Sequence, residues 1–489
     1  MVPSRVPILE DVATHDFPMN SRLAVWLFWA FVLLLTPRSP AADWPTYGGD
    51  NARSSISPDA LPTTIVEGWT WTSPHPPQPA WQGEAKWDGW NKVYNLKPRQ
   101  IFDRAFHAVL ARNRVFFGSS ADDKVYCLDE RTGRELWSFF TEGPVRLAPT
   151  IDGDRIYFGS DDGLVYCLQA DTGELVWQQR IGPSDRRIPG NGRVISVWPV
   201  RTSVLVREGI LYATAGMFPA EGVHLVALDA ANGKERWRQV QKDLPAQGYL
   251  LASASRLYIP AGRDNPVVCD LATGQRIRVV EGAGGTYALL AGEALVFGPG
   301  KTGQLGLVED GSADQLATFQ GNHMIVTPDR SYLHSDTDLS ALDRARYLAL
   351  ARDRKRLSTE QSKLSRDLRK LGEQPAQAAA REPLKKRLAE IGPRIDALSA
   401  SMQDCLLWKI PCSWSLSLIL AGPTLVAGGS SEVAAFDTAN GRELWKHSVT
   451  GQAYGLAAAR GLLVVSTDQG TLHCLRAPTR QAALSPLTP

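Results

Sequence analysis

Two arginines of this 489-residue chain stand in the same short context, Arg146 in GPVRLAP and Arg201 in WPVRTS. A guanidinium group can hold a carboxylate through two parallel hydrogen bonds, and tyrosine faces can stack on a ring. Arginines grouped with histidines and tyrosines therefore predict a site for an anionic or sugar-like ligand. The alternative is that these side chains are solvated or paired locally. In chain order, the candidates are Arg104, His107, Arg146, Arg201, Tyr249, Tyr287, His323 and Tyr454.

A repeat of about 40 residues must position these candidates. VYCLDERTGRELW (125–137) returns as VYCLQADTGELVW (165–177), and each copy combines short alternating strands with a turn that ends in glycine. Such a unit cannot bury its apolar face alone, so copies must stack. In a ring of copies, the first strand of each copy faces a central channel, and the candidate residues lie at the start of these strands. We therefore expect them at the channel rim.

Eight copies can be counted from the position that Asp129 occupies in the first. Insertions of about 20 and 55 residues separate some of them, and the eighth copy stops before its last strand. The strand predicted at 64–72 has no copy of its own, so we expect it to complete the eighth and close the ring. The equivalent positions are Asp129, Gln169, Asp229, Asp270, the neighbourhood of Glu309, Asp343, Asp437 and Arg476.

The N-terminus predicts export. Arg22 precedes a run of thirteen apolar residues, 23–35, which is too short to span a bilayer, and Ala41 and Ala42 suit signal-peptidase cleavage. We expect a signal peptide over 1–42, with Met19 as a possible true start, and a periplasmic or extracellular protein. The propeller would then occupy 43–477, with a C-terminal tail over 478–489.

The cysteines give little sign of chemistry. Three of the six share one repeat position that alanine fills elsewhere, so we interpret them as small core residues. Cys405 and Cys412, which are six residues apart and flank Trp408, are the candidate disulfide. The sequence suggests no metal ligands and no catalytic residue, because it contains no adjacent cysteines and no recognisable nucleophile, zinc or nucleotide motif.

The repeats CLDERTGRELW, CLQADTGELVW, ALDAANGKERW and AFDTANGRELW resemble the tryptophan-docking motif of the pyrroloquinoline quinone (PQQ) repeat superfamily. DWPTYGGDNARSS (43–55) is also similar to the start of quinoprotein alcohol dehydrogenases. The resemblance implies an all-β, eight-bladed propeller like those of quinoprotein dehydrogenases and of BamB. It also implies that the repeated tryptophans lock one blade to the next. These structural docking residues are Trp137, Trp177, Trp237, Trp408 and Trp445.

The same resemblance leaves two functions open. A quinoprotein dehydrogenase has adjacent cysteines at its cofactor, calcium ligands and a catalytic aspartate, and we can assign none of these here. The prediction is therefore an exported, noncatalytic propeller that serves as a binding or assembly scaffold. The alternative is a PQQ- and calcium-dependent dehydrogenase of an alcohol or a sugar, with PQQ implied by resemblance alone.

A helical insertion interrupts the sixth copy. Residues 344–404 replace the strand pattern with leucines at helical spacing, which predicts an antiparallel hairpin. Residues 344–402 contain 15 Lys and Arg against 7 Asp and Glu, whereas the whole chain carries only +2. This arm could bind an acidic protein partner, an anionic lipid surface or a polyanion, or it could be a solvated face. Nucleic acid is not expected for an exported protein.

Overall fold

The computed structural model describes residues 42–81, 87–88, 93–94, 101–190, 192–262, 264–280, 287–292, 294–298, 304–309, 315–372 and 377–478. The predicted signal peptide lies outside these residues, apart from Ala42. No helix in this described part of the chain is both long and apolar enough to cross a membrane.

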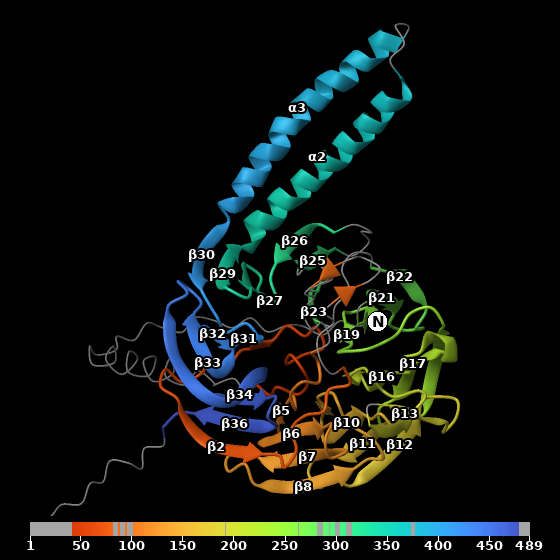
Figure 1. The fold of residues 1–489 in the computed structure, drawn as a ribbon, viewed down its shortest axis with the longest axis vertical. Coiled ribbons are helices and arrows are strands. Elements are labelled where there is room, and N and C mark those ends of the chain that lie inside the picture. Colours follow the sequence, from red (N-terminus) through yellow and green to blue (C-terminus); the bar gives the residue numbers. More distant parts are fainter. Residues whose placement is uncertain are drawn as a thin grey trace, which may run out of the picture. The chain divides into compact units, whose positions relative to one another are not determined.

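Eight four-stranded antiparallel blades follow one another in chain order around a common centre (Figure 1), which confirms the predicted fold class. Each blade runs from an inner to an outer strand. Blade 1 is β5 (Val109–Ala111), β6 (Arg114–Ser119), β7 (Lys124–Asp129) and β8 (Glu135–Phe140). Blade 2 is β9 (Thr150–Asp152), β10 (Arg155–Gly159), β11 (Leu164–Gln169) and β12 (Leu175–Arg180). Blade 3 is β15 (Leu205–Arg207), β16 (Ile210–Ala215), β17 (Val223–Asp229) and β18 (Glu235–Gln241). Blade 4 is β19 (Leu251–Ala252), β20 (Arg256–Ala261), β21 (Asp264–Asp270) and β22 (Arg276–Val279).

The second half of the chain repeats this plan. Blade 5 is β23 (Tyr287–Ala291), β24 (Ala294–Gly298), β25 (Gln304–Val308) and β26 (Ala317–Gln320). Blade 6 is β27 (His323–Val326), β28 (Arg330–His334), β29 (Asp338–Asp343) and β30 (Leu406–Pro411). Blade 7 is β31 (Ser417–Ala421), β32 (Thr424–Gly428), β33 (Ser430–Asp437) and the first part of β34 (Glu443–Ala459). Blade 8 is the rest of β34, β35 (Leu462–Thr467), β36 (Thr471–Arg476) and β2 (Val66–Thr72).

The ring closes through a strand from near the N-terminus. β2 pairs antiparallel with β36, from Val66 opposite Arg476 to Thr72 opposite Thr471. Because β2 supplies the outer strand of blade 8, β36 is paired on both sides and the ring is closed by strands from near the two ends of the described chain.

Docking tryptophans link neighbouring blades. The indole N–H of Trp137 in blade 1 donates to the Ala170 carbonyl of blade 2 at 3.2 Å, and Trp177 in blade 2 donates to Ala230 of blade 3 at 3.0 Å. Trp408 of blade 6 bonds Thr438 of blade 7 in the same way. In each case the acceptor follows the repeat's aspartate position by one residue, so one repeated contact stabilises many blade interfaces.

The same contact occurs at the point of closure. Trp69 of β2 donates to the Glu130 carbonyl of blade 1 at 2.8 Å and is 8% exposed. Trp237 packs against Gly274 of the next blade, and Trp445 lies partly buried against the core that blades 7, 8 and 1 share. The last blade is therefore tied to the first by the same device as its neighbours.

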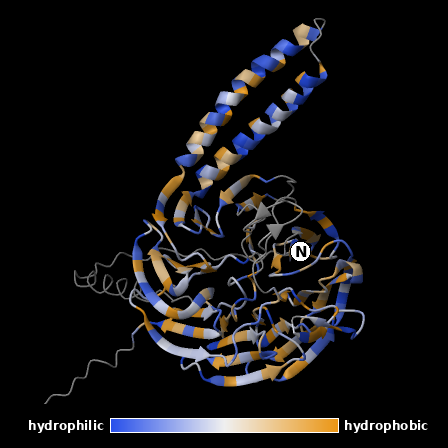
Figure 2. Ribbon diagram, in the orientation of Figure 1, coloured by the Kyte–Doolittle hydropathy of each residue, from blue (hydrophilic) through white to orange (hydrophobic). Residues whose placement is uncertain are grey.

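The predicted helical arm leaves blade 6 between its third and fourth strands. α2 (Arg344–Lys370) and α3 (Ala378–Gln403) contact each other along their length, and α2 also contacts β28 and β29 at its base. Asp343 accepts a hydrogen bond from the backbone N–H of Arg346 and so caps α2. Figure 2 shows hydrophilic residues over much of both helices, because only a narrow apolar stripe lies between them.

The predicted disulfide between Cys405 and Cys412 is wrong: all six cysteines are free. The residues between the two form β30, and an extended strand of this length separates its ends by about 20 Å, far beyond the roughly 6 Å that a disulfide allows between Cα atoms. The Cys412 thiol instead lies 3.8 Å from Nε2 of His334.

Candidate functional site at the channel mouth

One mouth of the central channel is crossed by the N-terminal segment 44–57. Its backbone carbonyls accept hydrogen bonds from the inner strands of five blades, and the Asn51 side chain donates to a sixth. The bonded inner-strand residues stand at or next to the last position of each strand, so the segment lies across the ends of these strands. The bonded inner-strand residues are Leu110, Ile151, Val206, Ala252, Leu290 and Leu420.

Arg53 anchors this segment. Its buried guanidinium group donates to the Leu250 carbonyl at 2.9 Å and to carbonyl and hydroxyl oxygens of the segment itself. Burial lowers the pKa of Arg53 to about 10, against the opposing effect of Asp50. The arginine that looked like part of a family signature is thus a structural anchor that holds residues 44–57 against the inner strands.

An aromatic stack lies behind this segment. The Tyr47 ring lies parallel to that of Tyr249, with centroids 3.5 Å apart, and His107 meets Tyr47 edge-on at 5.1 Å. The Tyr249 hydroxyl accepts a hydrogen bond from the Ala148 backbone, which joins blade 4 to the entry of blade 2. Burial lowers the pKa of His107 to about 4 and raises that of Tyr47 to about 12, so both are neutral near pH 7.

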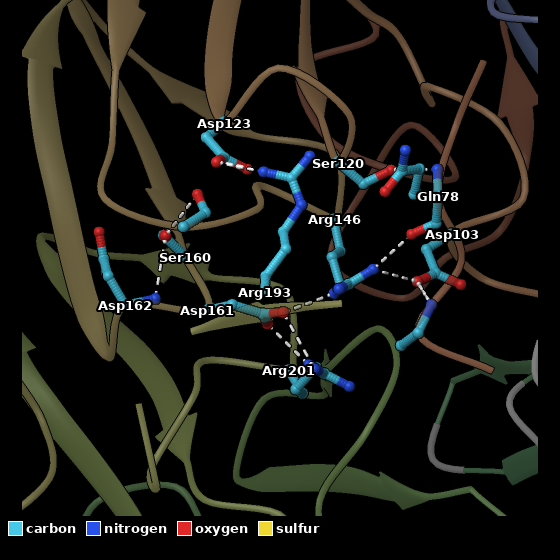
Figure 3. Close-up of polar contacts among 12 residues, drawn as sticks. Gln78, Asp103, Ser120, Asp123, Arg146, Ser160, Asp161, Asp162, Arg193 and Arg201 are labelled. Carbon is cyan, nitrogen blue, oxygen red and sulfur yellow. Dashed lines mark hydrogen bonds and ion pairs between the residues drawn. The ribbon is translucent and has the colours of Figure 1, made fainter. Parts of the chain in front are cut away.

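At the opposite mouth, Arg146 and Arg201 converge on one carboxylate, Asp161 (Figure 3). Nε of Arg146 lies 2.7 Å from Oδ2 of Asp161, and Nε and one terminal nitrogen of Arg201 lie 2.6 and 2.9 Å from its two oxygens. The three side chains are at most 2% exposed. We call them, with Asp103, the arginine–aspartate cluster.

Asp103 completes the cluster through Arg146, whose terminal nitrogen lies 3.2 Å from Oδ2 of Asp103. Burial opposes ionisation of Asp161, but the charges of Arg201 and Arg146 outweigh it and hold its pKa below the usual value. Burial raises the pKa of Asp103, against the opposing effect of Arg146. The two arginines therefore lie beside two different carboxylates. Asp161 has a lowered pKa and is ionised near pH 7, whereas Asp103 has a raised pKa and is protonated more easily.

The cluster also fastens a strap of chain over this mouth. Arg146 donates to the Gln78 carbonyl at 2.6 Å, and Asp103 accepts from the Ala80 backbone at 2.7 Å. The strap begins at blade 8, where Ser73 bonds Gly470, and reaches blade 4, where the Trp81 indole donates to Gln247. Residues 73–81 thus cross from one side of the ring towards the other over the paired arginines.

A short hairpin adds to this cover. β13 (Arg187–Gly190) and β14 (Arg193–Ser196) belong to the insertion between blades 2 and 3, and Arg193 pairs with Asp123 of blade 1 (Figure 3). Arg187 pairs with Glu142 between blades 1 and 2. Arg187 and Arg193 therefore form ion pairs within the protein that link the hairpin to neighbouring blades.

The remaining rim candidates lie in separate contacts. The Tyr287 hydroxyl bonds both backbone groups of Met324, and its ring meets His323 edge-on at 5.1 Å. The Tyr454 hydroxyl donates to Gln452 at 2.9 Å. Arg104 contributes a backbone bond to Ile101, and its Nε finds no hydrogen-bond acceptor among the described residues.

The structure therefore places Arg146 near Arg201, His107 near Tyr249, and Tyr287 near His323. These three pairs do not line one common ligand site. The contacts match the alternative in which rim residues are paired locally. Sequence reasoning missed Asp161, Asp103 and Tyr47. The sequence carries no local signal for the two aspartates, because Asp161 meets Arg201 across 40 residues and Asp103 meets Arg146 across 43.

All six cysteines are buried and separate, and no group of three His, Cys, Asp or Glu side chains in the described part of the chain could hold a metal ion. The buried aspartates nearest the channel mouth, Asp161 and Asp103, are bonded to arginine instead of being available as a base. An anionic ligand at Arg146 and Arg201 would have to displace Asp161.

Comparison with known proteins agrees with the architecture. The family model described as outer membrane protein assembly factor BamB matches residues 71–197, 121–286 and 429–483, which together span more than half of the chain. A quinoprotein ethanol dehydrogenase of Pseudomonas putida is 28% identical over 133 residues, which is 25% of this chain. The match spans only 21% of that curated relative's length.

Solved structures show the same fold at low identity. Quinohemoprotein alcohol dehydrogenase from Comamonas testosteroni superposes with a TM-score of 0.57 over 94% of this chain and 84% of its own, at 12% identity. The computationally designed Ika8 protein gives 0.52 over 77% of this chain and 97% of its own, also at 12% identity. With the repeat, the closed ring and the family match together, the chain belongs to the PQQ-repeat family that the outer membrane protein assembly factor BamB model describes.

Proposed function

We propose that this protein is an exported, noncatalytic propeller that serves as a binding or assembly scaffold. The observation that carries the proposal is the arginine–aspartate cluster. Its two guanidinium groups, which offer the best-placed positive charge at the channel, are already neutralised by Asp161 and Asp103 and are covered by residues 73–81. A neutralised and covered cluster stabilises the ring, whereas a cofactor site needs open ligands.

The aromatic stack and the segment 44–57 support the same proposal. Tyr47 stacks on Tyr249 inside the ring, and the segment that carries Tyr47 is bonded to six inner strands. Binding within the channel would require both this segment and the opposite strap to move. Surfaces outside the channel are therefore the places where we expect protein partners to bind.

The predicted signal peptide supports export, and so does the family model, whose description names an outer membrane protein assembly factor. An outer membrane protein assembly factor works where exported proteins pass, so we propose a periplasmic or extracellular location for this chain as well.

The competing function is oxidation of an alcohol or a sugar with PQQ and calcium, which the short match to the quinoprotein ethanol dehydrogenase favours. The test is reconstitution with PQQ and Ca²⁺, followed by dye-linked oxidation of ethanol and glucose, with a known quinoprotein dehydrogenase as positive control. The proposal expects no oxidation above a boiled sample. Turnover that needs both PQQ and Ca²⁺ would establish the dehydrogenase instead.

A further inference from the structure

Basic residues gather most densely at the end of the helical arm, where a net charge of +4 falls within 24 residues, against +4 in the other 35 residues of 344–402. Residues 363–386 carry seven basic and three acidic side chains, a net charge of +4, so the rest of the chain carries −2. We call the seven basic residues the tip cluster: Lys363, Arg366, Arg369, Lys370, Arg381, Lys385 and Lys386.

The ion pairs that join different elements lie at the base and in the middle of the arm. Near the base, Arg352 pairs with Glu309 of blade 5 at 2.7 Å, and midway along the arm Arg387 of α3 bridges to Glu360 of α2 at 2.6 Å. In the tip cluster, the described ion pairs are only within one helix, Lys370 with Asp367 and Lys385 with Glu382. Six of the seven tip residues are exposed, and Arg381 is half-buried.

The basic residues lie on the outer faces of both helices. The inner faces pack together, with Leu357 and Ile391 buried between them. At 100° per residue, Lys363, Arg366 and Lys370 point away from the inward leucines of α2, and Lys386 points away from those of α3. Because the two outer faces look in opposite directions, the cluster surrounds the tip, and a flat charged surface would meet it end-on.

Distance isolates the tip charge from the acidic body. A helix of 27 residues is about 40 Å long, and surface charges are screened beyond about 8 Å at physiological ionic strength. The negative remainder of the chain therefore neither cancels the tip's field nor prevents its approach to an anionic surface.

We propose that the tip cluster docks the protein on an anionic lipid bilayer. Protein interfaces are built around aromatic or aliphatic anchors, yet the large exposed hydrophobic side chains of the described residues all lie outside 344–405. Attraction to phosphate headgroups needs only clustered positive charge, with each Lys or Arg near the surface strengthening binding about fivefold. The tip has the charge and lacks the anchors, so it fits a lipid surface better than a folded protein.

The test is sedimentation of the full chain with vesicles of phosphatidylcholine alone or with 30% phosphatidylglycerol. The tip variant carries Lys363→Gln, Arg366→Gln, Lys385→Gln and Lys386→Gln. The matched control removes four exposed basic residues of the propeller by Arg131→Gln, Arg134→Gln, Lys234→Gln and Lys446→Gln. Glutamine is a good helix former, so helix content, checked by circular dichroism, is expected to persist.

We expect the parent and the control to bind the anionic vesicles at least tenfold more strongly than the neutral ones, and the tip variant to lose this preference. Raising salt from 50 to 300 mM should weaken the parent in the same way. Equal binding of the parent to both vesicles, or equal loss in both variants, would overturn the proposal. If the tip variant loses helix, Lys385→Gln with Lys386→Gln alone replaces it, with a loss of at least fivefold expected.

Binding of the parent to soluble polyphosphate or to an acidic protein, without binding to the anionic vesicles, would also overturn the lipid assignment. A membrane-docking arm would serve a scaffold or a dehydrogenase equally. The vesicle assay and the cofactor assay can therefore fail separately.

Discussion

Replacing Asp161 with asparagine should destabilise the ring far more than the loss of one surface charge. Asp161 is fully buried and accepts three hydrogen bonds from Arg146 and Arg201. The asparagine amide would place an N–H₂ group against these donors and leave Arg201 without the carboxylate that neutralises it. Breaking a buried pair from one side costs about 3–5 kcal/mol, because the partner charge stays buried.

Asp171 of the same blade provides a matched control. It also pairs with two arginines, Arg112 at 2.7 Å and Arg114 at 3.0 Å, but its side chain is 48% exposed. Water screens such pairs, so Asp171→Asn should cost at most about 1 kcal/mol. The two substitutions differ chiefly in burial.

The assay is urea unfolding followed by both tryptophan fluorescence and circular dichroism, with free energies compared where the two probes coincide. Arg201→Gln added to Asp161→Asn removes the unpaired cation, so the double variant should lose less stability than the two single losses added together. A loss for Asp161→Asn within about 1 kcal/mol of that for Asp171→Asn, or strict additivity in the cycle, would refute this account of the cluster.

Three further predictions follow from the closure, the blade turns and the buried imidazoles. Trp69→Ala, which removes the closing contact, should cost about 3–5 kcal/mol in urea unfolding, whereas Trp81→Ala on the strap should cost about 1; equal losses would contradict the closing role. Gly173→Ala should destabilise the protein by about 1–3 kcal/mol more than Gly153→Ala. Both glycines have positive φ, but only a Cβ added at 173 would meet an indole, that of Trp137, at 2.7 Å. The difference between the melting midpoints of the two variants measures this difference in stability. Stability should fall as pH drops from 6.5 towards 4, by about 1.4 kcal/mol per pH unit for His107, because His107 is then protonated in the unfolded chain but stays neutral in the folded protein. His107→Gln should flatten the pH profile of stability. An unchanged slope would exclude this histidine as a cause.

The repeated parts of the fold could be predicted, because the same turn and docking contacts need the same residues in each copy. Asp129 and Gly133 form the turn of one blade, and Trp137 docks on the equivalent turn of the next blade. Each copy of this pattern therefore predicts one blade. The arm was predictable for the same reason, since its leucines return at helical spacing.

The parts of the site that do not repeat could not be predicted. Asp161 meets Arg201 across 40 residues and Asp103 meets Arg146 across 43, and no local pattern encodes such pairs. Residues 44–57 are irregular, so nothing in their spacing shows that they cross six inner strands. The disulfide prediction failed because residues 406–411 extend as a strand where a loop would have brought the two cysteines together.

The most direct test of the scaffold proposal is whether the channel holds the cofactor at all. The protein is incubated with excess PQQ and Ca²⁺, passed through gel filtration, and scanned for quinone absorbance at the protein peak. The account predicts no retained PQQ above a sample without protein, since Asp161 already binds both arginines and Tyr47 is stacked on Tyr249. Retention of about one PQQ per chain that is lost in Arg146→Gln with Arg201→Gln would contradict it.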